Sequence, residues 1–159
     1  LFDASNYLKQ SEKPIVFLIF GSGKSASFFE NKIKNMNVLN VSFKFIPFQY
    51  NLYPFTLGIC DVGIYFHHKD YVIDAPPCLL DMISCELPII TCRYGCSQSF
   101  IKDSRAGGIL LENYDQLGAK LKDIFVTHSI SLSKLRNDFR TNLNDQSEIL
   151  WNDAFINIV

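Results

Sequence analysis

Continuous apolar runs alternate along this chain with segments whose apolar residues recur at helical spacing. The run PIVFLIF at 14–20 ends in Gly-Ser-Gly, which predicts a buried strand followed by a tight turn. The next segment, 25–36, places four apolar residues on one predicted buried helix face: Phe28, Phe29, Ile33 and Met36. The pattern therefore begins with a strand, a turn and a helix.

The same alternation continues to the end of the chain. An apolar helix is predicted within 1–10, strands at 41–46, 62–66, 88–92 and 109–111, helices at 53–59, 76–86 and 114–125, and a long amphipathic segment over 132–158. Strands that lack a polar face and alternate with helices indicate an α/β fold, a Rossmann-like parallel sheet with helices on both faces. In such folds ligands bind at the carboxyl ends of the strands.

The amphipathic segment carries more apolar residues than one helix at a sheet edge needs. Its stripe consists of Leu132, Leu135, Phe139, Leu143, Leu150, Trp151, Phe155 and Ile158. Ordinary packing explains such a stripe, and the alternative is that part of it docks on a neighbouring domain.

Length and charge narrow the classes of protein. The 159 residues, 48% of them hydrophobic, are enough for one well-buried core, so we expect a single domain over 1–159 with 131–159 as a carboxy-terminal helical segment. A net charge of −1 with scattered Lys and Arg gives no electrostatic footprint for nucleic acid. No apolar run approaches the roughly 20 residues that span a bilayer.

The five cysteines are odd in number and lie mostly in apolar segments, which favours a reducing, cytosol-facing setting over a disulfide framework. A metal site would recruit Cys92 and Cys96 with His67 or His68. However, C-x3-C without a second spaced pair is a poor zinc signature, so we expect no metal.

Residues 57–91 hold the strongest candidate site, because Asp74 and Asp81 bracket a helix start at Pro76-Pro77. The amides of a helix N-terminus can hold a diphosphate, and Asp81 can accept hydrogen bonds from sugar hydroxyls. The plainer alternative makes Asp74 a capping residue and Asp81 a solvated helix position. Apolar neighbours lead us to place Asp81 either on the polar edge of a mostly buried helix or against a ligand, and we favour the ligand.

The motif GSGKS at 21–25 follows a predicted strand, as a phosphate-binding P-loop would. A P-loop needs another glycine where Leu18 stands, so the loop is too short. Gly21 and Gly23 would still let a nucleotide approach the backbone, although a simple tight turn also explains them. A small hydrolase built on this loop remains an alternative, which predicts magnesium-dependent triphosphate binding abolished by Lys24→Ala.

The loop after the strand at 62–66 begins with His67 and His68, at a carboxyl end where ligand contacts collect. Either histidine could hydrogen-bond a sugar or a phosphate. Loop histidines are also often plain surface residues, so this alternative stays open.

A long ordered series of motifs resembles the carboxy-terminal half of the chitobiosyldiphosphodolichol β-mannosyltransferase family, two-domain GT-B glycosyltransferases of the N-glycan pathway. The series comprises G-x-G after PIVFLIF, then IPFQYNLYPFTLGICDVGIYFH, DAPPCLLD, MISCELP, Cys96, and the tail FRTNLNDQSEILW. The resemblance implies inverting transfer of mannose, as a β-1,4 linkage, from GDP-mannose to dolichyl-diphosphate-linked chitobiose. It also implies the cytosolic face of the endoplasmic reticulum membrane, with no metal and no cofactor.

The resemblance further implies a set of donor-binding residues. Asp74 would lie at the mannose end, Asp81 would hold the ribose hydroxyls, and amides around Asp74, Ala75 and Pro76 would meet the diphosphate. Phe48 flanks the implied nucleobase pocket. Three more positions match the family pattern: Gly21, Gly23 and His67.

Three positions depart from the family pattern, the first of them Ser22, which stands in the middle of G-x-G, a motif that Lys24 follows. Cys78 stands where the family has a lysine that would complement the diphosphate charge, and Ser99 stands where an acidic residue is usual. Lys24 is a candidate for the missing charge.

The chain starts at Leu1 without methionine, so we expect a piece of a longer protein. The acceptor domain, the membrane anchor and the catalytic base would precede Leu1, which leaves this piece inactive alone and the base unassigned. The competing hypothesis is a non-catalytic module, similar to a nucleotide-sugar-binding domain, that docks on a partner chain.

Overall fold

The computed structural model describes residues 1–21, 24, 26–66, 77–94, 101 and 108–144, with the side chains of 139, 140 and 142–144 excepted. The chain divides into two compact units. The first comprises Leu1–Pro54 with Asp115–Ile130, and the second comprises Phe55–Tyr114 with Ser131–Val159.

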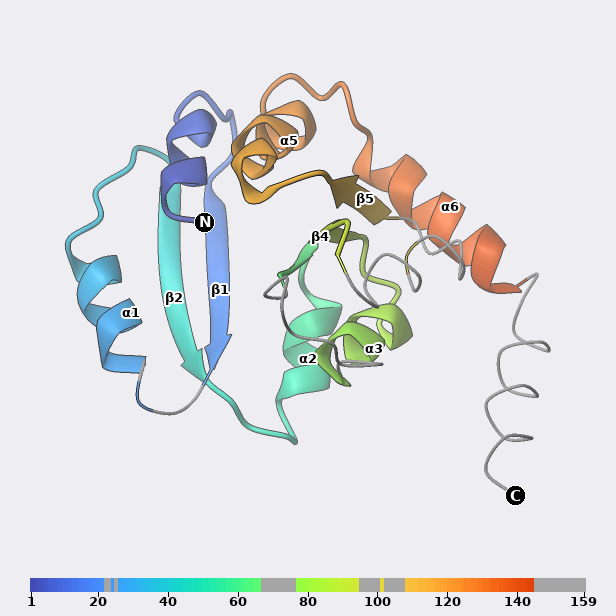
Figure 1. Ribbon diagram of the computed structural model, residues 1–159, viewed down its shortest axis with the longest axis horizontal. Helices are drawn as coiled ribbons and strands as arrows, with labels where there is room; N and C mark the ends of the chain where they lie inside the picture. The colour runs from blue at the N-terminus through green and yellow to red at the C-terminus, as the bar shows by residue number, and fades with distance from the viewer. Residues whose placement is uncertain (22–23, 25, 67–76, 95–100, 102–107, 145–159) are drawn as a thin grey trace. The chain divides into compact units, whose positions relative to one another are not determined.

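The first unit is built on two parallel strands, β1 (Ile15–Gly21) and β2 (Val41–Pro47), which lie side by side in Figure 1. Phe17 lies directly opposite Phe43, and their rings stack at 4.9 Å. The ring of Phe2 tilts against Phe43 at 5.1 Å. Aromatic cross-strand pairs of this kind stabilise a sheet, so the apolar runs become the core of the unit.

Helices complete the first unit. The 3₁₀ helix η1 (Asp3–Leu8) packs against α5 (Leu117–Phe125), which follows the short 3₁₀ helix η2 (Tyr114–Gln116). Tyr7 covers Gly118 so closely that any added side chain at Gly118 would collide with its ring. This contact fixes how η1 lies against α5.

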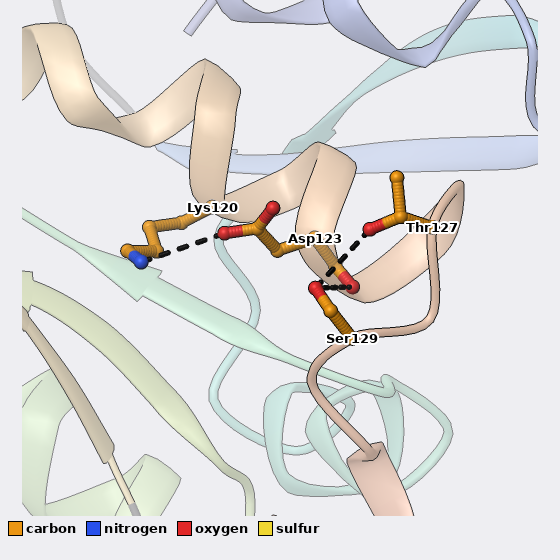
Figure 2. Close-up of polar contacts among 4 residues, drawn as sticks. All are labelled: Lys120, Asp123, Thr127 and Ser129. Atoms are coloured by element: carbon orange, nitrogen blue, oxygen red, sulfur yellow. Dashed lines mark hydrogen bonds and ion pairs between the residues drawn. The ribbon is translucent and has the colours of Figure 1, made fainter.

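Hydrogen bonds around Asp123 end α5. The Ser129 hydroxyl donates to the Asp123 carbonyl oxygen at 3.3 Å and lies 3.1 Å from the Thr127 hydroxyl, while Lys120 pairs with the Asp123 carboxylate at 3.4 Å (Figure 2). The Ile130 amide donates to the same carbonyl oxygen at 3.1 Å. These bonds satisfy a carbonyl that the helix end would otherwise leave unpaired.

The second unit contains a parallel three-stranded sheet in the order β3 (Gly63–Tyr65), β4 (Ile89–Cys92), β5 (Gly108–Leu111). Helix α3 (Pro77–Ser84) packs on it, with Leu79 buried against Ile89 and Ile101. Every residue of β4 is buried, as expected for the central strand of a covered parallel sheet.

A Schellman-type turn ends α3. The Leu87 amide donates to the Met82 carbonyl oxygen at 3.0 Å, and the Glu86 amide donates to the Ile83 carbonyl oxygen at 2.9 Å. Glu86 adopts the left-handed φ of 52° that this turn requires. The turn leads the chain from α3 directly into the central strand.

Helix α6 (Leu132–Asn144) is fastened to the second unit by Arg136. The guanidinium donates to the Cys60 carbonyl oxygen at 2.8 Å and lies 3.6 Å from the Asp61 carboxylate. The apolar stripe predicted beyond Asn144 falls outside the described residues, so its packing and docking interpretations remain predictions.

The predicted fold class is confirmed, since the elements alternate and every named strand pairs in parallel. In the described residues the strands form two separate pairing sets instead of one continuous ladder. The remaining predicted elements appear as α1 (Ala26–Lys34) and α2 (Tyr53–Gly58).

The predicted buried face of α1 is wrong in part. Phe28 is 61% exposed, and no residue of α1 is fully buried, while Phe29, Ile33 and Met36 are half-buried. The spacing predicted the helix correctly, but α1 packs mainly beside β2, the edge of a two-stranded pair, which offers too little surface to cover all the apolar side chains of α1.

Candidate functional site

The structure brings two of the predicted donor-binding residues together in the first unit. Gly21 ends β1 opposite Pro47, and the Phe48 amide donates to the Gly21 carbonyl oxygen at 3.2 Å. Both residues therefore lie at the carboxyl end of the β1–β2 pair, the edge where parallel sheets bind ligands.

Aromatic side chains gather around Phe48. Its ring lies 5.0 Å from Tyr50 and 4.8 Å from Tyr53, and Phe20 meets Tyr53 edge-to-face at 5.2 Å. Phe48 is 37% exposed and Tyr50 is 86% exposed, whereas Tyr53 is buried. The cluster thus presents one supported ring and one open ring, an arrangement suited to stacking a planar group.

Asp81 lies in the second unit, on the exposed side of α3. Of the α3 residues only Leu79 is fully buried, and Leu80 is 40% exposed. The expectation of a mostly buried helix around Asp81 is therefore wrong, because the short α3 buries one side only. Its exposed carboxylate is available to solvent or to a ligand, so both interpretations stay open.

Cys78 stands in the first turn of α3 as an uncharged group. Burial raises the pKa of its thiol, and the Asp81 carboxylate adds to the shift, while the Leu79 and Cys78 amides oppose it. Cys78 consequently supplies no positive charge near the helix start. Lys24 is exposed in the first unit.

The other predicted site residues lie outside the described residues: Gly23, His67, Asp74, Ala75 and Pro76. The same holds for His68, Cys96 and Ser99. Their roles remain predictions. Within the part of the chain that the structure describes, no three His, Cys, Asp or Glu side chains gather as metal ligands, and no helix is long and apolar enough to cross a bilayer.

The structure adds a polar cluster that the sequence reasoning missed, at the carboxyl edge of the three-stranded sheet. Arg93 follows β4 and its Nε lies 3.3 Å from the Glu112 carboxylate, which follows β5. The Tyr94 hydroxyl donates to the Glu112 carbonyl oxygen at 3.2 Å, and Tyr114 lies between the rings of Tyr94 and Phe66, at 5.8 and 5.1 Å. The signal available in the sequence was position, since Arg93 and Glu112 come directly after predicted strands.

Comparison with known proteins finds several relatives that carry the same protein name. No protein family model matches the chain. The human chitobiosyldiphosphodolichol beta-mannosyltransferase is 25% identical over 145 residues, which cover 91% of this chain, and the Dictyostelium discoideum protein of the same name is 27% identical over 123 residues, 77% of this chain. This chain is a distant homologue of part of these mannosyltransferases.

This chain also matches the Arabidopsis thaliana UDP-glycosyltransferase TURAN, with 32% identity over 111 residues, 70% of the chain. It spans 24% of TURAN and of the Dictyostelium protein, and 31% of the human protein. The resemblance noted from the motifs is therefore confirmed as distant homology to about a quarter to a third of each relative.

A solved structure agrees with the fold. The crystal structure of Anabaena HepE in complex with UDP-glucose matches this chain with a TM-score of 0.63 and 15% sequence identity, over 91% of this chain and 39% of HepE. This match confirms the α/β architecture expected of a GT-B glycosyltransferase domain.

Proposed function

We propose that this chain is the donor-binding part of a β-mannosyltransferase that transfers mannose from GDP-mannose to dolichyl-diphosphate-linked chitobiose. The observation that carries the proposal is the homology to chitobiosyldiphosphodolichol beta-mannosyltransferases, which extends over 91% of the chain in the human protein. The HepE match supports a nucleotide-sugar ligand, because that structure contains UDP-glucose.

The nucleoside would bind at the carboxyl edge of β1 and β2. Gly21 lacks a side chain, which lets a ligand approach the backbone, and the Phe48 ring offers a stacking surface already supported by Tyr53. Asp81 would accept hydrogen bonds from the ribose hydroxyls through its exposed carboxylate.

The diphosphate and the sugar would lie near the start of α3. Backbone N–H groups around Asp74 and Ala75 would donate to the phosphates, with Asp74 at the mannose end. Pro76 has no N–H and would instead shape the backbone there, and the helix N-terminus favours negative charge. His67 and Gly23 would complete the site.

An inverting transfer also needs a base that deprotonates the acceptor hydroxyl on the face opposite the leaving diphosphate. No residue of this chain is assigned to that role. The chain would stabilise the departing diphosphate, and the transfer would take place at the cytosolic face of the endoplasmic reticulum membrane. We expect the 159-residue chain alone to bind the donor without turnover.

Calorimetric titration tests the proposal. The chain should bind GDP in the micromolar to millimolar range, and UDP and ADP more weakly. Since TURAN is named a UDP-glycosyltransferase, a preference for UDP would contradict the mannosyl donor while keeping the nucleotide-sugar site. Absence of binding to all three nucleotides would contradict the proposal and favour the non-catalytic docking module.

A further inference from the structure

Arg93, a charged residue, directly follows the central strand β4 and has no role in the site proposed above. We propose that Arg93 is a donor-binding residue whose guanidinium contacts the phosphates of the nucleotide. The inference rests on the proposed nucleotide-sugar function and adds a phosphate contact to it.

The backbone holds Arg93 at a defined place. Its amide donates to the Leu111 carbonyl oxygen at 2.8 Å, which extends the parallel ladder by one residue and sets Arg93 opposite Glu112. The Tyr94 amide donates to the Cys92 carbonyl oxygen at 2.8 Å, closing a three-residue turn centred on Arg93. Arg93 therefore starts its side chain from a fixed point on the ligand-binding edge.

The side chain is held at one nitrogen and open at the others. Nε of Arg93 lies 3.3 Å from the Glu112 carboxylate. Within the described ranges, no hydrogen bond or ion pair is found for its two terminal nitrogens, and the side chain is 48% exposed. A guanidinium fixed through Nε keeps a planar pair of donors available, and that fork matches two oxygens of a phosphate.

Neighbouring groups keep this arrangement in place. The Tyr94 hydroxyl donates to the Glu112 carbonyl oxygen, and Tyr114 packs edge-on against Tyr94 and Phe66. Because Glu112 and the aromatic rings already restrain the site, Arg93 would lose little conformational freedom when a ligand arrives.

Charge supports the same assignment. A diphosphate requires positive charge close by, and Cys78 at the start of α3 is a neutral thiol. Among the described residues that directly follow β3, β4 and β5, Arg93 is the only cation. The negatively charged Glu112 pairs only with Nε of Arg93, so the two terminal nitrogens can still donate hydrogen bonds to an anion.

The experiment compares GDP with guanosine, which lacks the phosphates. Arg93→Gln should weaken GDP binding about tenfold or more, the scale of a lost charge-assisted hydrogen bond, and leave guanosine binding unchanged. Arg136→Gln is the matched control, because Arg136 also pairs with a carboxylate in the second unit, and it should bind GDP like the wild type.

The double variant R93Q/E112Q separates a phosphate contact from a structural ion pair, since it removes both charges together. It should remain about as weak for GDP as R93Q. Wild-type GDP affinity in R93Q, or recovery of affinity in the double variant, would overturn the role of Arg93 while the proposed function stands. Failure of the wild-type chain to bind GDP would overturn both.

Discussion

The Phe48 amide donates a hydrogen bond to the Gly21 carbonyl oxygen at 3.2 Å, which ties together the ends of β1 and β2. Gly21, which lies in the glycine-rich turn, and Phe48, which the family resemblance identified, thus lie at one edge of one strand pair. The edge is set by backbone bonding, so side-chain changes at either residue can test ligand contact without removing the bond itself.

Gly21→Ala should lower GDP affinity with little loss of stability. A Cβ at Gly21 would lie 3.5 Å from the Phe45 ring, an ordinary contact, so the fold has room for the methyl group. A ligand that packs against the Gly21 backbone would collide with the same methyl group. Calorimetry measures the affinity and thermal melting measures the stability. Gly58→Ala, whose Cβ would meet nothing within 4 Å, is the control and should change neither. Unchanged GDP binding in G21A would contradict close approach at Gly21.

Asp81→Ala should weaken GDP binding by about 1–3 kcal/mol, the usual scale for losing hydrogen bonds to a charged group. Asp81 is exposed on α3, so the replacement should leave the melting temperature nearly unchanged. Asp138→Ala on α6 removes another exposed carboxylate of the same unit and serves as the control. Equal affinities of the two variants would support the plain solvated position instead.

Thr91→Val should raise the free energy of unfolding by up to about 1 kcal/mol. Thr91 is 1% exposed in β4, and its buried hydroxyl has no hydrogen-bond partner among the residues that the structure describes, whereas valine has nearly the same shape without the polar atom. Urea unfolding provides the measurement. Ser11→Ala offers the contrast and should destabilise, because the buried Ser11 hydroxyl donates to the carbonyl oxygens of Lys13 and Phe125. A loss of stability in T91V would show that the hydroxyl has a partner.

Gly118→Ala should destabilise the chain by about 1–3 kcal/mol, because the new methyl group must displace the Tyr7 ring from α5. A double-mutant cycle with Tyr7→Ala identifies the cause. If the penalty is steric, G118A should cost much less once the ring is gone. Additive effects of the two substitutions would contradict a direct Tyr7–Gly118 contact.

Alkaline pH should destabilise the fold. Burial raises the pKa of the Cys60, Cys78, Cys85 and Cys92 thiols above their ordinary value of 9.0. The unfolded chain therefore loses these protons first as the pH rises past 9, so the folded state binds more protons there and stability falls. Urea unfolding between neutral pH and about pH 10 should show this slope, and Cys85→Ala should reduce it. A stability that is flat in this range would contradict the raised values.

Sequence reasoning predicted the elements of the fold well where apolar spacing decides them. The runs around Phe17 and Ile89 became strands, and the Pro77 helix started where proline allows. Spacing could not show that Phe28 would stay exposed, because that depends on how much surface α1 finds to cover it.

The candidate site was predictable only in part, for a related reason. Gly21 could be chosen from the glycine-rich turn after a predicted strand, whereas Phe48 was identified only by the resemblance to the mannosyltransferase family. Arg93 and Glu112 each directly follow a predicted strand, but their pairing could not be predicted, because it depends on the register between β4 and β5. Pairing across strands is a property of the folded sheet.

The packing of η1 on α5 bears on how this polypeptide can be recombined with other pieces. Leu8 is fully buried and Tyr7 packs over Gly118, so the first ten residues cover one side of α5. A shortened chain that began at β1 would lack η1, and the buried side chains of Leu117 and Leu121 on α5 would be exposed to water. Any chimera that joins this polypeptide to an acceptor-binding half should therefore make its junction before Phe2.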